Sequence, residues 1–293
     1  MTMTLPRTIE IVEVGPRDGL QDEDVVATDV KIAYAEALIA AGVRRIEVAS
    51  FVNPKRVPQM ADSEAVVERL RSHADGGVRL IGLVLNERGL DRAMETALAE
   101  INIVVVVSDT FSNANQGMDS AAALAMARTV VSRATAAGLR TGVTLSAAFG
   151  CPYEGEVPAD RVLGIAREVA MMGAHEVSLA DTIGVAVPNQ TEDLVAAVLA
   201  ETRLPVRVHL HDSFGTGLAN AVAALTGGAT ALDSSTGGLG GCPFAPGASG
   251  NVATENLVRM LDRMGVTTGI DLAAINDAAT AIRDEIGAHP TCT

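Results

Sequence analysis

The sequence predicts a (β/α)8 barrel, and two observations support this prediction. Short runs rich in β-branched residues alternate with longer segments whose apolar residues recur at helical spacing, from one end of the chain to the other. Eight such pairs are the number that closes a barrel, and polar residues gather after the predicted strands, where barrels carry their active sites. A doubly wound open sheet is the main alternative, since alternation alone does not separate the two folds.

The predicted strands are the apolar runs at residues 9–14, 45–50, 78–85, 101–107, 140–147, 176–179, 206–211 and 231–235. The predicted helices between them cover residues 30–41, 63–71, 120–137, 160–172, 191–201 and 218–226. After the eighth pair we expect additional C-terminal helices at 254–264 and 271–286, packed on the barrel rim. No linker or low-complexity run divides the chain. We therefore expect one catalytic TIM-barrel domain over residues 1–293.

Composition and charge narrow the function. Aromatic residues are only 2% of the chain, so the core must be built from Val, Ile, Leu, Ala and Met, which suits parallel-sheet packing. The net charge of -14 and the absence of a basic run argue against nucleic acids and anionic membranes as partners. A small anionic substrate would depend on local cations, for which Arg17, Lys55 and Arg56 are the candidates.

The first seven residues contain no apolar run typical of a signal peptide, and no segment reaches the roughly 18 apolar residues of a spanning helix. The three cysteines, Cys151, Cys242 and Cys292, are an odd number without paired spacing. We therefore expect no disulfide scaffold. We expect a reducing, cytoplasmic location instead.

Two histidines lie two residues apart at the end of the seventh predicted strand. Because residues i and i+2 of a strand point the same way, His209 and His211 present two imidazoles to one point. A single strand histidine is usually structural, but this pair indicates metal binding or catalysis. The following Asp212 points away from the pair, and we expect it to serve a structural role or to support the metal ligands from behind.

The segment Val14-Gly15-Pro16-Arg17-Asp18-Gly19 follows the first predicted strand. Its composition is also good turn chemistry, so Asp18 could merely hold a loop. In a barrel, however, this position faces the ends of the other strands, and Asp18 can join the two histidines.

Residues 237–251 are too rich in glycine to form a helix or a strand. Such a segment suits close approach to a ligand and a mobile lid, and it contains Cys242 as a candidate proton donor. An ordinary flexible loop is the alternative. Asn251 either caps the next helix or offers its amide oxygen to a metal.

Two imidazoles, a carboxylate and an amide oxygen leave coordination positions open for substrate oxygens. This set suits Mg²⁺ or Mn²⁺, with zinc or iron as further options. Two histidines and one carboxylate also form the facial triad of non-haem iron oxygenases, but the barrel pattern does not favour that fold.

At these residues the sequence resembles the 3-hydroxy-3-methylglutaryl-CoA lyases, a family of the metal-dependent lyase and Claisen-condensation barrels. The motifs that carry the resemblance are residues 12–21, 50–55, 57–60, 150–155, 181–184 and 238–243. The last of them, with residues 247–251, resembles the signature loop of the lyases. The Arg-Asp pair and the His-x-His strand are shared across the wider superfamily.

The resemblance implies a role for each matching residue. Asp18, His209, His211 and Asn251 would hold the divalent cation. The remaining implied roles are neutralisation of the thioester enolate by Arg17, proton transfer by Cys242, support of the site by Glu47 and Asp181, and substrate binding by Gln21, Ser50, Lys55 and Thr144. The implied reaction splits 3-hydroxy-3-methylglutaryl-CoA into acetyl-CoA and acetoacetate.

Two positions depart from the family pattern. Thr144 stands where relatives often carry tyrosine, and Arg56 stands where a tryptophan is frequent. A longer or differently branched 3-hydroxyacyl-CoA is therefore an alternative substrate. A Claisen-condensing synthase of the isopropylmalate or homocitrate type and a non-catalytic CoA-binding protein are further alternatives. We expect a homodimer or a higher homo-oligomer.

Overall fold

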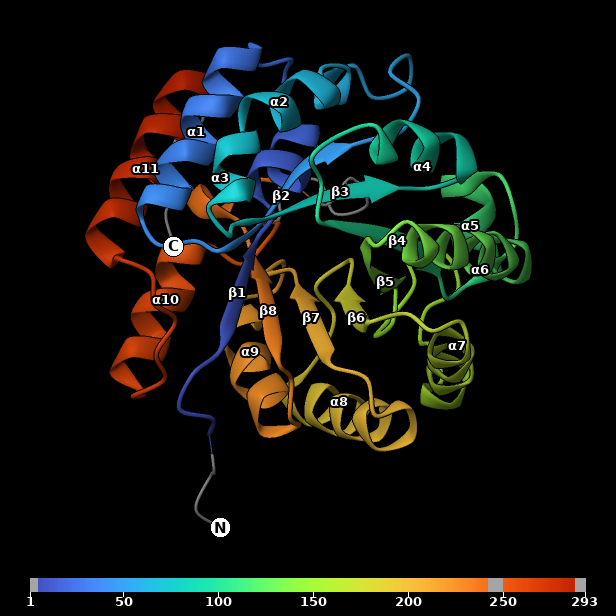
Figure 1. The fold of residues 1–293 in the computed structure, drawn as a ribbon. Coiled ribbons are helices and arrows are strands. Elements are labelled where there is room, and N and C mark those ends of the chain that lie inside the picture. Colours follow the sequence, from blue (N-terminus) through green and yellow to red (C-terminus); the bar gives the residue numbers. More distant parts are fainter. Residues whose placement is uncertain (1–4, 242–249, 288–293) are drawn as a thin grey trace.

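The computed structural model describes residues 5–241 and 250–287 and shows a closed barrel of parallel strands (Figure 1). Each strand pairs with the next in sequence, and the last pairs with the first. The strands are β1 (Glu10–Glu13), β2 (Arg45–Ser50), β3 (Arg79–Val84), β4 (Glu100–Val106), β5 (Arg140–Ser146), β6 (Glu176–Asp181), β7 (Val206–Leu210) and β8 (Ala231–Ser234). The predicted (β/α)8 barrel is confirmed, and the open sheet is excluded.

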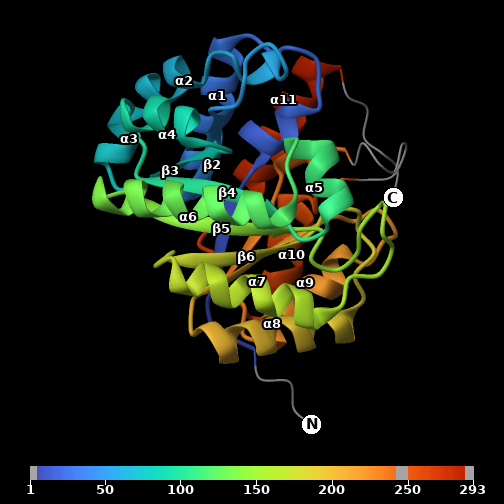
Figure 2. The ribbon, with the colours of Figure 1, turned by 90° about the vertical axis from the view of Figure 1, so that its right-hand side faces the viewer.

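Helices cover the outside of the strands, as the side view in Figure 2 shows for α6, α7 and α8. The helices of the barrel are α1 (Thr28–Ala40), α2 (Ser63–Arg69), α3 (Arg71–Asp75), α4 (Glu87–Met94), α5 (Asp109–Gln116), α6 (Ser120–Ala136), α7 (Ala159–Met171), α8 (Pro188–Thr202) and α9 (Gly217–Thr226). The sequence analysis missed α4 and α5, because both are short and polar. Local signals still delimit them: the Asn86 side chain accepts from Gly89 N at the start of α4, and Gly117 ends α5 with a φ of 73°.

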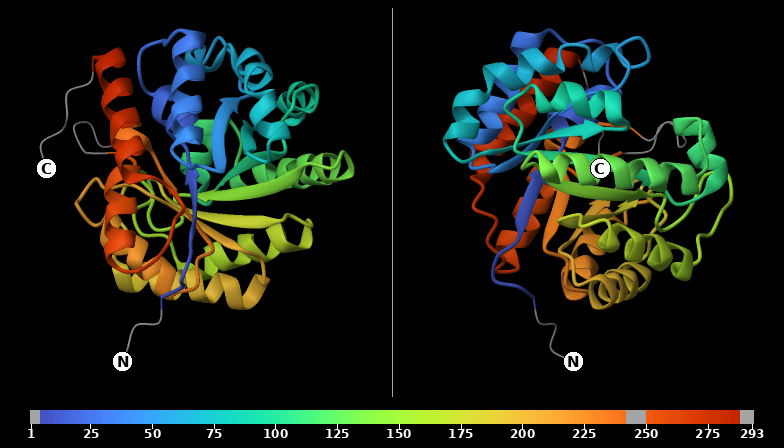
Figure 3. Two further views of the ribbon diagram at one scale, coloured as in Figure 1. Left: turned by 60° about the vertical axis from the view of Figure 1, so that its left-hand side comes forward. Right: turned by 45° about the vertical axis from the view of Figure 1, so that its right-hand side comes forward.

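The predicted C-terminal helices are α10 (Thr254–Arg263) and α11 (Leu272–Ile286). Helix α11 begins at Asp271, whose carboxylate accepts from Ala273 N and Ala274 N. It lies against α1 on the outside of the barrel, next to α10 (Figure 3). Both helices thus extend the outer helical layer rather than capping the rim.

The core has two parts of different chemistry. Aliphatic side chains fill the layer between strands and helices, as the composition predicts. The interior of the barrel, by contrast, holds charged residues: Arg45, Glu100, Glu176 and Arg207 are buried there. Arg45 donates to both Glu100 and Glu176, so the buried charges are paired. This ionic interior was not predicted.

No helix in the described residues is long and apolar enough to cross a membrane.

Candidate active site

A tight turn after β1 brings Arg17 and Asp18 over the barrel. The carbonyl of Val14 accepts from the backbone N–H groups of Arg17, Asp18 and Gly19, which winds residues 15–19 into a single turn. A Cβ at Gly15 would clash with the hydroxyl of Tyr34 and with the carboxylate of Glu13. Glycine is therefore required at this position, and the turn is held where the other strands end.

The predicted triad is brought together. One ligand atom from each of Asp18, His209 and His211 lies within 4.8 Å of the others, and the two imidazole centroids are 5.2 Å apart. Asp212 contributes instead to the start of α9, where its Oδ1 accepts from Gly217 N at 2.7 Å. The structural role expected for Asp212 is thus confirmed.

Asn251 reaches the triad because its backbone runs beside the end of β7. Asp212 N donates to Gly250 O, and Val252 N donates to Leu210 O. The Asn251 amide donates to Asp18 Oδ2 at 2.8 Å, while its Oδ1 is buried without a hydrogen-bond partner among the described residues. The helix-cap alternative is wrong, because the N-cap of α10 is Ala253.

The protonation states suit a cation. Burial, with the nearby charge of His209, lowers the pKa of His211 to about 4, so this imidazole is neutral, the form that binds metals. Its buried Nδ1 has no partner in the described part of the chain.

Asp18 is held in its charged form. Burial would raise the pKa of Asp18, but the charges of Arg17 and His209 outweigh this effect and lower the pKa. The donor set therefore fits a divalent cation.

His209 is oriented by a residue the sequence analysis missed. Its Nδ1 lies 3.2 Å from Asp233 Oδ2 on β8, which leaves Nε2 facing Asp18. Burial alone would lower the pKa of His209, but this hydrogen bond and the charge of Asp18 raise it. A carboxylate behind a ligating histidine fixes the tautomer and the ring orientation.

Replacing Asp233 by asparagine should therefore weaken metal affinity by about 10- to 100-fold, because the imidazole loses its charged orienting partner. Calorimetric titration of the purified protein with Mn²⁺ measures the effect. An unchanged affinity would show that the contact between Asp233 and His209 has no bearing on the metal.

Arg17 is held on both sides by carboxylates. Its Nε donates to Glu47 Oε1 at 2.5 Å and its Nη1 to Asp18 Oδ1 at 2.7 Å. The buried Glu47 thus fixes the guanidinium beside the triad. Glu47 therefore positions Arg17, and because it also lines the smaller cavity, its catalytic role stays a prediction.

Two cavities open next to the triad. The smaller, about 190 Å³, is lined by the triad histidines, Asp18 and residues of the barrel interior. The larger, about 620 Å³, extends from Asp18 past Arg56 and Met118. The two cavities are neighbours, because Arg17, Asp18 and Gln21 line both.

The predicted substrate-binding residues are placed unequally around these cavities. Gln21 and Thr144 line the smaller cavity. Lys55 is exposed and lines neither cavity, whereas its neighbour Arg56 lines the larger one. Ser50 is buried against Ser63 and also lines neither. Binding of substrate by Ser50 and Lys55 stays a prediction without a contact that supports it.

Asp181 supports a loop. Its two carboxylate oxygens accept from Val185 N at 2.9 Å and Ala186 N at 3.0 Å. Burial raises the pKa of Asp181 to about 6, and these hydrogen bonds only partly oppose the shift. Its catalytic role remains a prediction.

The raised pKa of Asp181 makes a pH dependence testable. In the folded protein the Asp181 carboxyl keeps its proton up to about pH 6, whereas in the unfolded chain it releases the proton near pH 4. The contribution of Asp181 to the free energy of unfolding therefore falls as the pH rises through this range. The free energy of unfolding of wild type, minus that of Asp181→Asn, should decrease between pH 4 and pH 6 in metal-free protein. Urea titrations at several pH values measure it, and a difference that rises with pH would contradict the assignment.

Cys242 and Cys292 lie outside the described residues. Cys151 is buried and accepts a hydrogen bond from Ser108 Oγ at 2.9 Å.

Several residues of the site escaped the sequence analysis. They are the inward-facing polar residues Asn102, Arg207 and Asp233, and Glu13, whose buried carboxylate accepts from Gly15 N and from Thr236 and Thr254 on either side of the glycine-rich segment. The sequence did contain a signal for them: polar residues alternate with apolar ones along a strand, as in Arg207, His209 and His211, and so share one face of it.

The chain is similar to known lyases over nearly its whole length. A family model described as HMGL-like matches residues 8–282. The hydroxymethylglutaryl-CoA lyase YngG of Bacillus subtilis is 41% identical over 289 residues, which cover 97% of this chain and 95% of that protein.

Two solved structures are closely similar to the fold of this chain. That of hydroxymethylglutaryl-CoA lyase from Pseudomonas aeruginosa has a TM-score of 0.94 at 40% identity, covering 98% of this chain and 96% of that one. An HMG-CoA lyase from Acinetobacter baumannii, solved with coenzyme A and 3-methylmalate, has a TM-score of 0.89 at 36% identity and covers 98% and 94%. The cluster of Asp18 with the two histidines thus stands in a chain that belongs to the HMGL-like family of carbon–carbon lyases.

Proposed function

We propose that this protein cleaves 3-hydroxy-3-methylglutaryl-CoA into acetyl-CoA and acetoacetate with the help of Mg²⁺ or Mn²⁺. The observation that carries the proposal is the cluster of Asp18, His209 and His211 at the junction of two cavities, with Arg17 fixed beside it. The names of the relatives support the substrate, and the complex with coenzyme A and 3-methylmalate supports an acyl-CoA ligand.

The cation would be held by Asp18, His209 and His211, with Asn251 Oδ1 as a fourth donor. When bound, it supplies a Lewis acid that acidifies the C3 hydroxyl of the substrate. The buried, unpartnered Oδ1 of Asn251 and Nδ1 of His211 agree with this assignment, since buried polar atoms in proteins normally have partners.

The reaction requires one bond to break and two protons to move. The C3 hydroxyl gives its proton to a base, the C3–O⁻ becomes the ketone of acetoacetate as the C2–C3 bond breaks, and the electron pair of that bond becomes the enolate of the acetyl thioester. Arg17 lines both cavities and is the cationic group that would meet the developing enolate oxygen. A proton then returns to C2, and Cys242 is the residue we propose for this transfer.

Incubation of the purified protein with 3-hydroxy-3-methylglutaryl-CoA and Mn²⁺ tests the proposal. We expect acetoacetate and acetyl-CoA in equal amounts, loss of activity with a chelator, and its return on addition of metal. Absence of acetoacetate at every metal concentration would refute the proposal. A cytoplasmic location and a homodimeric or larger assembly stay predictions, which cell fractionation and light scattering address.

A further inference from the structure

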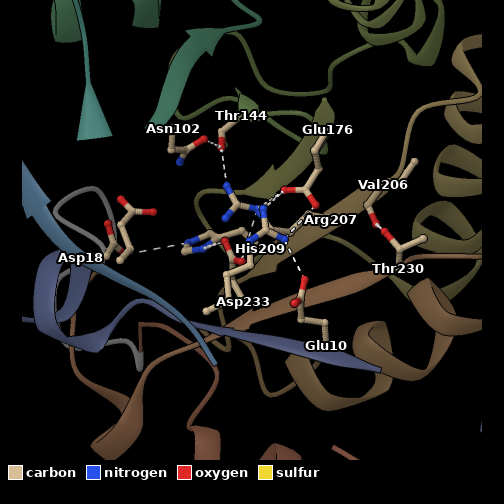
Figure 4. A network of polar contacts seen from close by, with 12 residues as sticks. Glu10, Asp18, Asn102, Thr144, Glu176, Val206, Arg207, His209, Thr230 and Asp233 are labelled. Carbon is tan, nitrogen blue, oxygen red and sulfur yellow. Dashed lines mark hydrogen bonds and ion pairs between the residues drawn. The ribbon is translucent and has the colours of Figure 1, made fainter. Parts of the chain in front are cut away.

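The nitrogen and oxygen ligands proposed for the cation differ in what holds them. Figure 4 shows His209, which stands on the regular strand β7 and faces Asp18. Asp18 and Asn251 stand outside the strands, in the turn after β1 and in the stretch that leads into α10. The continuous ladders of the barrel include neither oxygen ligand, so further contacts fix their positions.

The carboxylate of Glu13 joins the two segments that carry these ligands. Its Oε1 accepts from Gly15 N at 2.8 Å, at the start of the turn that contains Asp18. Its Oε2 accepts from Thr254 Oγ1 at 2.7 Å, three residues after Asn251. Glu13 and Thr254 are fully buried, so these hydrogen bonds form in a medium of low polarity, where they are stronger than in water.

The same carboxylate holds the end of β8. Thr236 donates to Glu13 twice, from its backbone N–H at 2.9 Å and from its hydroxyl at 2.5 Å. Beside it, Ser235 N donates to Val252 O at 3.0 Å, and Thr254 N donates to Ser235 O at 3.2 Å. The chain before and after the glycine-rich segment is thus drawn together at Glu13.

This junction depends on a carboxylate. The four hydrogen bonds that Glu13 accepts within residues 5–241 and 250–287 all come from neutral donors. Burial raises the pKa of Glu13 to about 7, and these hydrogen bonds oppose the shift because they favour the charged form. A side-chain amide in this place would point its own N–H groups at some of the donors, because only the carboxylate offers two accepting oxygens.

Close packing transmits the position of Thr254 to Asn251. The Asn251 amide donates to Asp18 Oδ2 at 2.8 Å and to Leu239 O at 3.1 Å, and its backbone N–H donates to Gly240 O at 3.1 Å. A Cβ at Gly240 would clash with the Asn251 amide, so the two are in direct contact. A shift of the stretch before α10 would therefore move the Asn251 amide relative to Asp18.

We infer that Glu13 is a positioning residue of the metal site, which acts through Gly15 and Thr254 to set the distance between the oxygen ligands Asp18 and Asn251. The inference rests on the proposed function in that it takes these two residues to be ligands. Glu13 lines neither of the cavities next to the triad, so it acts without touching the substrate.

Removal of one hydroxyl tests the inference. Thr254→Val keeps the size of the side chain and deletes its hydrogen bond to Glu13, whereas Thr254→Ser keeps the hydroxyl. Thr254→Val should weaken Mn²⁺ binding by about tenfold, the lower end of the usual effect of a residue that supports metal ligands, and Thr254→Ser should restore most of the loss. Glu13→Gln should weaken it at least as much. Calorimetric titration of the metal-free variants with Mn²⁺ measures the affinities.

Thr191→Val is the matched control for lost stability. Thr191 is a fully buried threonine on α8, and its hydroxyl donates to Val187 O at 3.2 Å, away from the triad. Urea titration should show that Thr191→Val and Thr254→Val both lower the free energy of unfolding. Only Thr254→Val should also lower the affinity for Mn²⁺.

A double-mutant cycle shows whether Thr254 acts through Asn251. Asn251→Ala deletes the fourth proposed donor and should itself weaken Mn²⁺ binding. Adding Thr254→Val to Asn251→Ala should then change the affinity by less than about twofold, because the side chain that Thr254 positions is gone. A general disturbance of the site would instead give the same loss in both backgrounds.

Three results would overturn the inference: wild-type Mn²⁺ affinity in Thr254→Val, an equal loss with and without Asn251, or wild-type affinity in Asn251→Ala, which would remove Asn251 from the ligand set. None of them depends on turnover. Failure to cleave 3-hydroxy-3-methylglutaryl-CoA, with the expected pattern of affinities intact, would refute the proposed reaction and leave the inference standing.

Discussion

Replacing Arg17 by methionine should lower kcat by about a hundred- to a thousandfold while KM changes much less. The negative charge on the thioester oxygen appears only as the C2–C3 bond breaks, so a cation that meets it acts on the transition state. The geometry agrees, because Glu47 and Asp18 fix the guanidinium at the junction of the two cavities. Steady-state kinetics with 3-hydroxy-3-methylglutaryl-CoA and Mn²⁺ measures both constants.

Arg56→Met is the matched control for this experiment. Arg56 lines the larger cavity but is exposed and remote from the described contacts of the triad, so its loss should raise KM with little change in kcat. If Arg17→Met instead raised KM and kept kcat, Arg17 would be an anchor for the bound thioester. Because Asp18 would lose a charged neighbour, the metal affinity of Arg17→Met has to be measured alongside, and the kinetics compared at saturating metal.

The fold and the clustering of Asp18 with His209 and His211 could be predicted because both depend on regular local patterns. Alternation of strand and helix signals predicts a barrel, and a barrel brings the ends of distant strands together, which places Asp18 next to His209 and His211. The spacing of the two histidines needs no tertiary information, since strand geometry alone points both side chains to one face.

The ionic interior could not be predicted in the same way. Arg45, Glu100 and Glu176 stand on three different strands, and each alone is indistinguishable from a charged residue at the water-facing end of a strand. Only the register of the closed barrel makes them neighbours, with Arg45 donating to both carboxylates. The role of Asp233 could not be predicted for the same reason, since its contact with His209 depends on how β7 and β8 pair.

At Asn251 the sequence left two alternatives open, and the structure excludes one of them. Asn251 precedes a helix and is a good capping residue, but the chain enters α10 at Ala253, after Asn251 has paired with His211. Backbone hydrogen bonds between residues 250–252 and 210–212 decide its position, and no sequence pattern at Asn251 itself contains them. Its amide therefore contacts Asp18 instead of the first turn of the helix.

Removal of one imidazole should abolish tight metal binding and activity together. His211→Ala deletes a proposed ligand whose pKa burial lowers to about 4, so that its imidazole is neutral and able to coordinate a metal near neutral pH. We expect the affinity for Mn²⁺ to fall by more than about a hundredfold, beyond the loss expected for Asp233→Asn, because a ligand contributes more than the residue that orients it. Calorimetric titration with Mn²⁺ measures the affinity, and the acetoacetate assay measures the activity.

His175→Ala separates this effect from a general loss of imidazole. His175 is partly buried and its Nδ1 contacts Thr141, away from the triad, so the variant should keep wild-type metal affinity. Should His211→Ala still bind Mn²⁺ as tightly as wild type, the unpartnered Nδ1 of His211 would need another explanation and the triad would not be the metal site. Should it bind Mn²⁺ weakly yet retain full turnover, the metal would have no part in the reaction, and another group would have to acidify the C3 hydroxyl of the substrate.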